Sequence, residues 1–355
     1  MPIDLTLHTE AVKIKREELI PALIGAGVCL FFSRTNLLSL FFLMPLGFLA
    51  FRYGHRVAWS AVSLVIAGNM LLALGTALTR GSAAAGLFWS VVYFAAMSSV
   101  FAWATAPPPG FPLKVCATMR LIIGSSVASL LLLVMFFRTM ASPNFLEHIG
   151  AATAAIASRQ EAAGADVVQS ALLSEVTPEA TLNFIRSTVL RGGALLSSVV
   201  LFFLCRQIGL ILARITARNK PLGVSSLEVN SLALFRAHPM LIWVLSGSLL
   251  LVVLTSMANI EPLEILLWNI LILCGIMYLA QGIGILQYFL ARPTMTPFMK
   301  LFFCISFCVL LLSPGINVVL FGGVVLLGIA ENWVPFRAPK PNGPPSTPEA
   351  GDSGN

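Results

Sequence analysis

A succession of apolar runs extends through most of this chain. Six runs are long enough to cross a bilayer as one helix: 57 to 78, 84 to 104, 119 to 137, 192 to 213, 240 to 259 and 265 to 290. Only 10% of the 355 residues are charged, against roughly a quarter in a soluble domain. So few charges cannot cover a soluble surface, whereas a helix in lipid pairs its own backbone groups and can face apolar side chains outward. The sequence therefore predicts an all-α integral membrane protein.

Four shorter apolar runs complete the predicted bundle. Residues 19 to 32 and 36 to 51 are separated by the polar group Ser33 to Asn36, so they form either two short tilted helices or a re-entrant pair. Residues 298 to 312 and 316 to 334 flank Ser313-Pro314-Gly315, which predicts a turn. Counting every run predicts a polytopic bundle of about ten transmembrane helices.

The distribution of Lys and Arg predicts the orientation, because loops kept in the cytoplasm carry the excess of positive charge. An N-terminus inside places most basic residues on the cytoplasmic side and leaves outside only Arg34, Arg80, Arg138, Arg159, Arg186 and Arg191. The net charge of +7 is thus interpreted as a topology signal, and no nucleic acid partner is expected. We expect a multi-pass protein of a bacterial cytoplasmic membrane, surrounded by the lipid bilayer, with both ends in the cytoplasm.

Composition divides the chain into five parts. They are a cytoplasmic N-terminal segment (1 to 18) without a convincing signal peptide, a first transmembrane block (19 to 137), an external helical loop (138 to 191), a second transmembrane block (192 to 337) and a disordered cytoplasmic tail (338 to 355). In the loop, the Ala-rich run 151 to 163 favours helix, and Thr177-Pro178-Glu179 predicts a helix start with an N-cap, a first-turn proline and an acid.

Polar residues within apolar runs are candidates for function, because they are costly in lipid. Cys274, Tyr278, Gln281 and Tyr288 share one face of the run 265 to 290, with Gly282 and Gly284 nearby and Asn269 about a third of a turn away. The interpretation we favour is hydrogen bonding between helices with close packing at the glycines. The alternative makes Tyr278, Gln281, Tyr288 and Asn269 the wall of a ligand cavity.

Two arginines within apolar runs and one pair of alanines complete the candidates. Arg120 and Arg206 lie near the inner ends of their runs, so we expect them to reach the interface and stay hydrated. Ala22 and Ala26 are four residues apart in the first run, a spacing that lets two helices approach closely.

Motifs for catalysis are missing from the sequence. It contains no H-E-x-x-H, no G-x-S-x-G and no Walker G-x-x-x-x-G-K-[ST]. The six cysteines lie in or beside apolar runs, and the pair Cys304 and Cys308 has no neighbouring His or acid to complete a metal site. We therefore expect no enzyme activity, no cofactor and no metal.

Residues toward the C-terminal end resemble a family. Phe235-Arg236-Ala237-His238-Pro239, Trp243, Asn269, Tyr278, Gln281, Gly282 and the stretch from Gly328 to Arg337 resemble the YybS-like bacterial membrane proteins over about 230 to 337. The family has no settled function. Its last motif is similar to Gly-x-x-Asp-x-Trp-x-Asp-Phe-Arg, so Gly328, Trp333, Phe336 and Arg337 match, while Glu331 and Pro335 replace the two acids. Trp333 and Phe336 suit an interfacial aromatic belt, and Arg337 suits a cytoplasmic helix end.

That family is distantly similar to the substrate-binding membrane subunits of energy-coupling-factor transporters for vitamins and metals. In those subunits an Ala-x-x-x-Ala pattern in the first helix contacts a partner membrane subunit, which the resemblance carries over to Ala22 and Ala26.

The sequence leads to one function hypothesis and one alternative. The first is a solute-binding or transport-associated component that captures a small molecule beneath the external loop helices and works with a partner complex. The alternative is a non-transporting scaffold, for which Tyr278 and Gln281 would be dispensable while the stretch from Glu331 to Arg337 would not. An intramembrane enzyme or lipid flippase ranks below both, since no catalytic cluster can be assembled.

Overall fold

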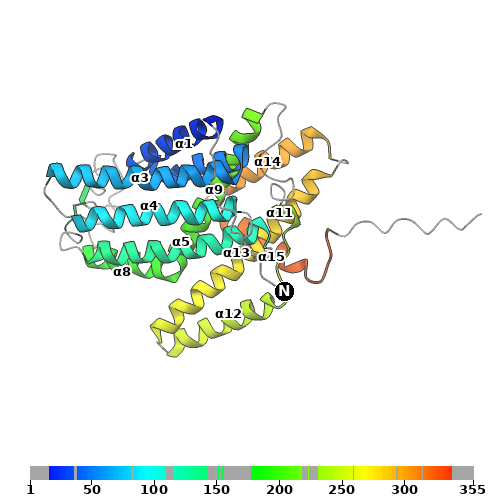
Figure 1. Cartoon of the computed structure of the whole chain (residues 1–355). Helices are drawn as coiled ribbons and strands as arrows, with labels where there is room; N and C mark the ends of the chain where they lie inside the picture. The colour runs from blue at the N-terminus through cyan, green and yellow to red at the C-terminus, as the bar shows by residue number, and fades with distance from the viewer. Residues whose placement is uncertain are drawn as a thin grey trace, which may run out of the picture. The chain divides into compact units, whose positions relative to one another are not determined.

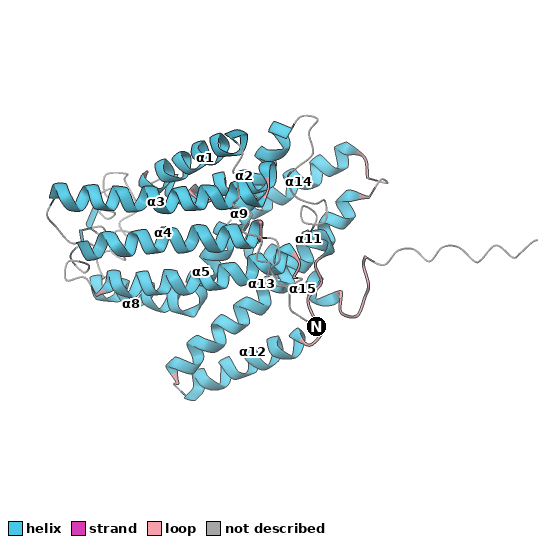
Figure 2. Cartoon of the chain, viewed as in Figure 1, coloured by secondary structure: helices cyan, strands magenta, loops and turns pink. Residues whose placement is uncertain are grey.

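Every element of the computed structural model, in the part of the chain that it describes, is a helix (Figure 2). The described residues are 16–35, 38–80, 84–108, 115–141, 145, 147, 150–151, 154–155, 177–217, 223, 231–258, 260–292, 295–313 and 315–337. Six of these helices are long and apolar enough to cross a membrane. This architecture is compatible with a helical membrane protein.

The helices follow the chain in the order coloured in Figure 1. The elements before residue 220 are α1 (Arg16–Arg34), η1 (Leu38–Phe41), α2 (Met44–Tyr53), α3 (His55–Arg80), α4 (Ala84–Thr105), α5 (Ala117–Met140), α8 (Pro178–Thr188), η2 (Val189–Gly193) and α9 (Ala194–Ala217). Those after it are α11 (Ser231–Leu234), α12 (Leu241–Ala258), α13 (Glu261–Ala291), α14 (Pro297–Leu312) and α15 (Ile316–Ala330). The six full-length runs predicted from the sequence coincide with α3, α4, α5, α9, α12 and α13, which confirms that they form helices long and apolar enough to span a membrane.

The four shorter runs also form helices, but their lengths do not establish ten spans. The run 36 to 51 is divided into η1 and α2, and α2 has ten residues, or about 15 Å of helix. Helices α14 and α15 have 16 and 15 residues, which is shorter than the roughly 30 Å hydrocarbon core requires of an upright helix. They are separated at Ser313 and Gly315, as the predicted turn requires, and Gly315 takes a positive φ of 84°.

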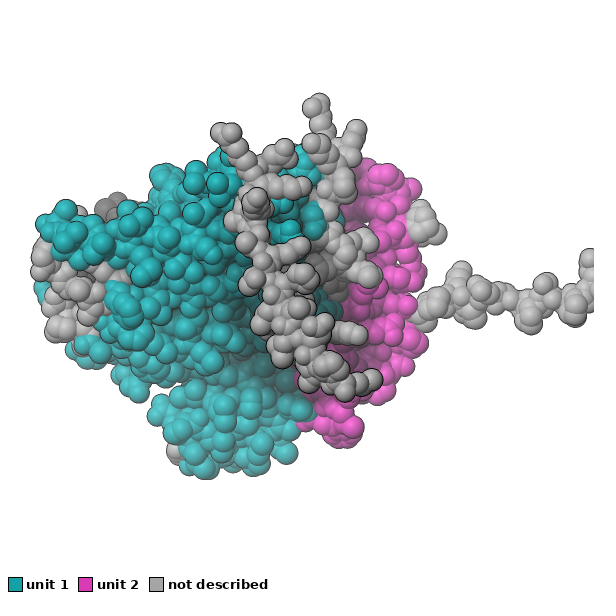
Figure 3. All heavy atoms as spheres, viewed as in Figure 1, with its two compact units in different colours: residues 1–231, 244–274 teal, residues 232–243, 275–355 magenta. Residues whose placement is uncertain are grey.

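Two compact units, coloured separately in Figure 3, make up the chain. Unit 1 comprises Met1–Ser231 with Val244–Cys274, and unit 2 comprises Leu232–Trp243 with Gly275–Asn355. The units do not follow the two predicted transmembrane blocks, because α9, most of α12 and the first half of α13 belong with the N-terminal helices. The second half of α13 belongs with α14 and α15.

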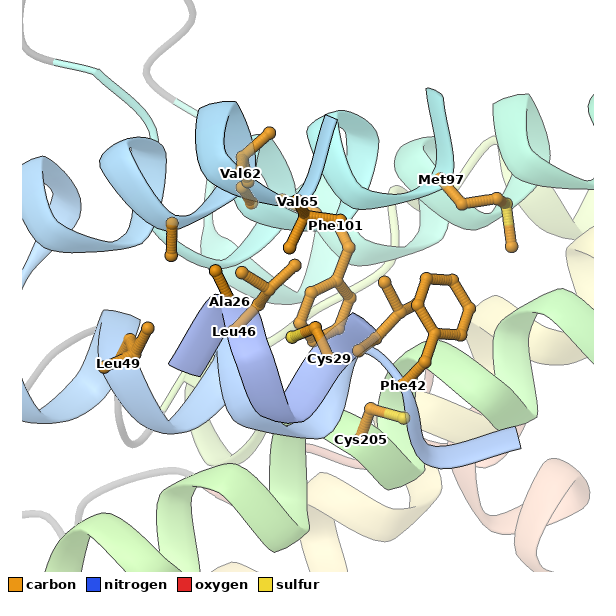
Figure 4. Close-up of a cluster of buried hydrophobic side chains, with 14 of the residues drawn as sticks. Ala26, Cys29, Phe42, Leu46, Leu49, Val62, Val65, Met97, Phe101 and Cys205 are labelled. Carbon is orange, nitrogen blue, oxygen red and sulfur yellow. The ribbon is translucent and has the colours of Figure 1, made fainter. Parts of the chain in front are cut away.

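The core of unit 1 is formed where α1, η1 and α2 pack against α3, α4, α5 and α9. Phe101, Phe202, Leu46 and Cys29 are fully buried in it, and Figure 4 shows side chains from α1, α2, α4 and α9 converging there. Phe101 and Phe202 meet edge to face with ring centroids 5.2 Å apart. The short helix α2 thus lies inside the bundle and packs against α9.

This packing bears on three predictions about unit 1. Ala22 and Ala26 are buried in the same core, with exposures of 0% and 3%. Their small side chains allow other helices of this chain to pack closely against α1. Arg120 is buried, and its guanidinium donates to the carbonyls of Ala104 and Val115. Arg206 is buried as well, with its guanidinium 5.3 Å from the Phe51 ring centroid.

The segment 138 to 191 is described from 177 onward and at a few earlier positions. Helix α8 begins at Pro178, and the Thr177 hydroxyl accepts a hydrogen bond from the Ala180 amide at 3.2 Å, so the predicted N-cap is confirmed. Most of the Ala-rich run 151 to 163, the N-terminal segment before Arg16 and the tail after Arg337 lie outside the described residues.

Unit 2 is held together by close backbone approaches at glycines. A Cβ at Gly282 of α13 would collide with the Val324 carbonyl of α15, and one at Gly328 of α15 would collide with the Tyr278 carbonyl of α13. Gly284 approaches the Leu232 carbonyl of α11 in the same way. Only a residue without a side chain allows these backbones to meet.

Candidate functional site

A polar cavity lies in unit 1, between α8 with η2 and the start of α13. We call it the outer cleft, after the outer position that the sequence predicts for residues 138 to 191. Its volume is about 580 Å³, within the range of small-ligand sites. Its lining residues are Asn183, Phe184, Arg186, Ser187, Leu190, Arg191, Glu261, Pro262 and Ile265.

One wall of the outer cleft is an amphipathic face of α8. Asn183, Arg186, Ser187 and Leu190 recur at i, i+3, i+4 and i+7, which places them on one side of the helix. The helix cannot continue straight into α9, because Arg191 and Gly192 have non-helical backbone angles and Gly192 takes φ 111°. This kink turns α8 away from the axis of α9.

The first half of α13 stabilises the kink from the other side. Asn269 donates from its Nδ2 to the Leu190 carbonyl at 2.7 Å, a backbone group close to the non-helical residues. Glu264 pairs with Arg191 across 3.2 Å. A Cβ at Gly192 would collide with Ile272, so glycine is needed there both for its φ and for the space. Asn269 therefore positions the cleft rather than pointing into it as a lining residue.

The charges in the outer cleft have both signs. Arg191 is partly neutralised by Glu264, whose carboxylate oxygen it contacts. Arg186 and Glu261 are exposed and make no ion pair with any described residue. A solute entering the cleft would meet a guanidinium from α8 and a carboxylate from the first turn of α13, beside the phenyl ring of Phe184.

The polar stripe predicted on α13 has a different setting, within unit 2. Gln281 is 2% exposed; its Oε1 accepts from the Ala237 amide at 2.8 Å and its Nε2 donates to Glu331 at 2.9 Å. Arg337 forms a buried ion pair with the same Glu331. Its guanidinium also donates to the carbonyls of Ala233 and Phe235. We call Gln281, Glu331 and Arg337, with the backbone groups they bind, the C-terminal clip.

The clip gives Arg337 a role that the sequence did not predict. Its side chain, expected to mark a cytoplasmic helix end, is 4% exposed and fully engaged with protein groups. A buried guanidinium requires such partners, because an uncompensated charge in a low-dielectric interior is costly. Gly328 supports the clip by letting α15 approach α13, and Phe336 is half-buried beside it in the sequence.

The other stripe residues are also placed by packing. Tyr278 is fully buried, and its hydroxyl accepts from Asn332 Nδ2 at 3.3 Å. Tyr288 is half-buried, with the Arg292 guanidinium 5.2 Å from its ring centroid. Trp333 is 68% exposed, as a side chain in an aromatic belt would be. Cys274 is buried near the middle of α13, and among the described residues no group of three metal-ligating side chains occurs.

The structure therefore brings some of the sequence candidates together and separates others. Gln281, Glu331 and Arg337 come together in the clip, with Tyr278 and Gly328 adjacent, while Asn269 lies at the kink and Tyr288 beside Arg292. Sequence reasoning did not select Asn183, Arg186 or Glu261. The signal that could have found them is the amphipathic spacing of 183, 186, 187 and 190, directly before a glycine pair.

Comparisons with known proteins return no match: no family, no curated protein and no solved structure is significantly similar to this chain.

Proposed function

We propose that this chain is a multi-pass membrane protein that binds a small charged solute in the outer cleft and delivers it to, or signals it to, a partner membrane complex. The observation that carries the proposal is the 580 Å³ cleft beneath α8, with Arg186 and Glu261 unpaired in the described part of the chain. The absence of a Walker motif from the sequence favours a component that relies on a partner for energy.

The lining chemistry indicates the class of solute. A guanidinium recognises a carboxylate or phosphate in a bidentate manner, and a carboxylate accepts from an ammonium group. The cleft presents one of each, together with the amide of Asn183 and the ring of Phe184. A small zwitterion with an anionic group for Arg186 and a basic group for Glu261 satisfies both.

The orientation belongs to the same proposal. Ten spans with both ends in the cytoplasm would place α8 and the first turn of α13 on the outer side of a bacterial cytoplasmic membrane, where a solute arrives. The likeness to YybS-like proteins and to energy-coupling-factor subunits is compatible with this role. Ala22 and Ala26 are engaged inside unit 1, so the partner contact is proposed for other apolar surfaces.

The test is purification in mild detergent followed by mass spectrometry of bound small molecules. We expect a charged metabolite to co-purify with the wild-type protein, and its amount to fall at least tenfold in Arg186→Gln and in Glu261→Gln. Matched controls are Arg214→Gln and Glu179→Gln, which remove exposed charges outside the cleft lining. Equal amounts of bound solute in all four variants would refute the proposal.

A scaffold remains the second candidate, and one observation favours it. Helices α14 and α15 of unit 2 expose large apolar side chains, among them Phe298, Phe302 and Val319. Photo-crosslinking from position 302 in cells is the direct test: recovery of one defined membrane protein supports a scaffold, whereas crosslinks to lipid alone contradict it. Gln281 binds Glu331 in the clip, so a change at Gln281 disturbs the same structure as a change at Glu331, under both the solute-binding and the scaffold proposals.

A further inference from the structure

Unit 1 contains a second cavity, of about 430 Å³, on the surface where α1, α2 and α9 meet. We call it the apolar groove. Ile24 and Val28 of α1 form one side, Met44 and Phe48 of α2 form the other, and Leu212 of α9 closes it. Gly25 and Leu49 also line the groove, and they pack so closely that a Cβ at Gly25 would collide with the Leu49 side chain.

The dimensions of the groove match one membrane leaflet. It follows α2 from Met44 to Tyr53, which is nine residue steps and about 13 Å of helix. Half of the roughly 30 Å hydrocarbon core is about 15 Å. A lipid acyl chain is the apolar object that extends through this depth.

Polar groups occur at one end of the groove. Tyr53 lines that end, and the guanidinium of Arg52 lies 5.8 Å from its ring centroid. On α1, Glu18 precedes Pro21 and Gly25 by three and seven residues, so it lies on the helix face that carries these two lining residues. This end of the groove thus has a phenol in its lining, a guanidinium against that phenol, and a carboxylate on the α1 face that carries Pro21 and Gly25.

A second apolar groove, between α3 and α4, has no phenol in its lining. It has a volume of about 370 Å³ and is lined by Met70, Leu74, Phe88, Val91 and three further apolar residues, with no charged or phenolic group among them. It supplies an internal control for nonspecific contact with lipid.

We propose that the apolar groove holds one acyl chain of a zwitterionic phospholipid, with its phosphate bound by Arg52 and its amine facing Glu18. The proposal depends on the membrane location of the chain and not on the outer cleft. A lipid that fills the groove would join α1 to α2 and α9 and complete the surface of unit 1.

The test is native mass spectrometry of the full chain, released from nanodiscs that contain phosphatidylethanolamine, phosphatidylglycerol or diacylglycerol with the same acyl chains. We expect the wild-type protein to retain one phosphatidylethanolamine and to retain diacylglycerol, which lacks the phosphate and amine, at least tenfold less. A preference for phosphatidylglycerol, or equal retention of diacylglycerol, would overturn the assignment of the headgroup.

Paired variants locate the site. Ile24→Trp fills the groove and should lower retention at least tenfold, whereas Leu23→Trp, on the same helix and equally exposed at 60%, should not. Leu74→Trp fills the control groove and should also leave retention unchanged. Equal effects of Ile24→Trp and Leu23→Trp would overturn the proposal.

A second pair does not depend on how the groove repacks. Arg52→Gln should remove the preference for phosphatidylethanolamine over diacylglycerol, and Arg56→Gln, in the next helix, should preserve it. An unchanged preference in Arg52→Gln would exclude Arg52 as the phosphate ligand. These readouts are independent of solute binding, so the lipid site and the proposed function can fail separately.

Discussion

Glu331 and Arg337 form a buried ion pair, with side-chain exposures of 3% and 4%. Their neighbours supply what burial demands: Gln281 donates to the carboxylate, and the carbonyls of Ala233 and Phe235 accept from the guanidinium. Such a pair costs desolvation when it forms, and it costs much more when one partner is removed and the other charge stays buried. The clip should therefore be more sensitive to single substitutions than any exposed pair.

We predict that Glu331→Gln destabilises unit 2 by about 3 to 5 kcal/mol, because it leaves Arg337 buried without its counter-ion. Thermal unfolding in detergent would measure this as a large fall in Tm. The control is Glu264→Gln, which breaks a pair whose Arg191 side chain is 42% exposed and should cost about 0 to 1 kcal/mol.

The double variant Glu331→Gln with Arg337→Met gives an independent readout. It removes both charges, so we expect it to be more stable than Glu331→Gln alone. A double variant less stable than the single one would mean that the ion pair is not the source of the effect.

At the scale of helices, α13 and α15 are joined by glycines rather than by interdigitated side chains. Gly282 and Gly328 each lie against a backbone carbonyl of the other helix. A methyl group at either position has no flexible neighbour to displace, so the helices must separate.

We predict that Gly328→Ala lowers the stability of unit 2 by about 1 to 3 kcal/mol, the usual cost of overpacking. Gly322→Ala and Gly323→Ala are matched controls on the same helix, because nothing lies within 4 Å of a Cβ at either position. Both controls should be neutral or slightly stabilising, since alanine favours helix more than glycine does. Similar melting temperatures for all three variants would contradict the proposed packing.

The sequence predicted helices better than it predicted contacts, for a physical reason. A 20-residue apolar run and a Thr-Pro-Glu start are local signals, so the six spans and the start of α8 were recovered. Gln281 and Glu331 are 50 residues apart, and nothing local shows that their helices meet. Arg206 was misplaced because depth along a helix does not reveal which face is covered by protein.

The candidate site was predicted only in outline. The loop over the outer mouth was expected to shelter a cavity, and α8 does border one. The interpretation favoured for the polar stripe, hydrogen bonding between helices with close packing at the glycines, agrees with the contacts of Gln281 and Gly282. Polarity within an apolar run marks both ligand sites and helix contacts. Asn269 is an example of the second kind, because it binds the Leu190 carbonyl.

For the whole molecule, the decisive quantity is the number of crossings. We predict that α8 and the C-terminal tail lie on opposite faces of the membrane, because ten crossings and the excess of internal Lys and Arg require it. A cysteine at position 183 should react with an impermeant maleimide in intact cells, and a phosphatase fused after residue 355 should be inactive. Labelling at position 183 together with an active phosphatase would place α8 and the tail on the same face and would exclude ten spans.

The C-terminal clip also has a consequence for how the protein is made. Arg337 leaves the ribosome 104 residues after Ala233, the carbonyl of which it binds. Gln281 likewise leaves the ribosome 50 residues before Glu331, so its amide lacks the carboxylate until the end of α15 has been synthesised. The clip can therefore close only when almost all of the described chain has been made.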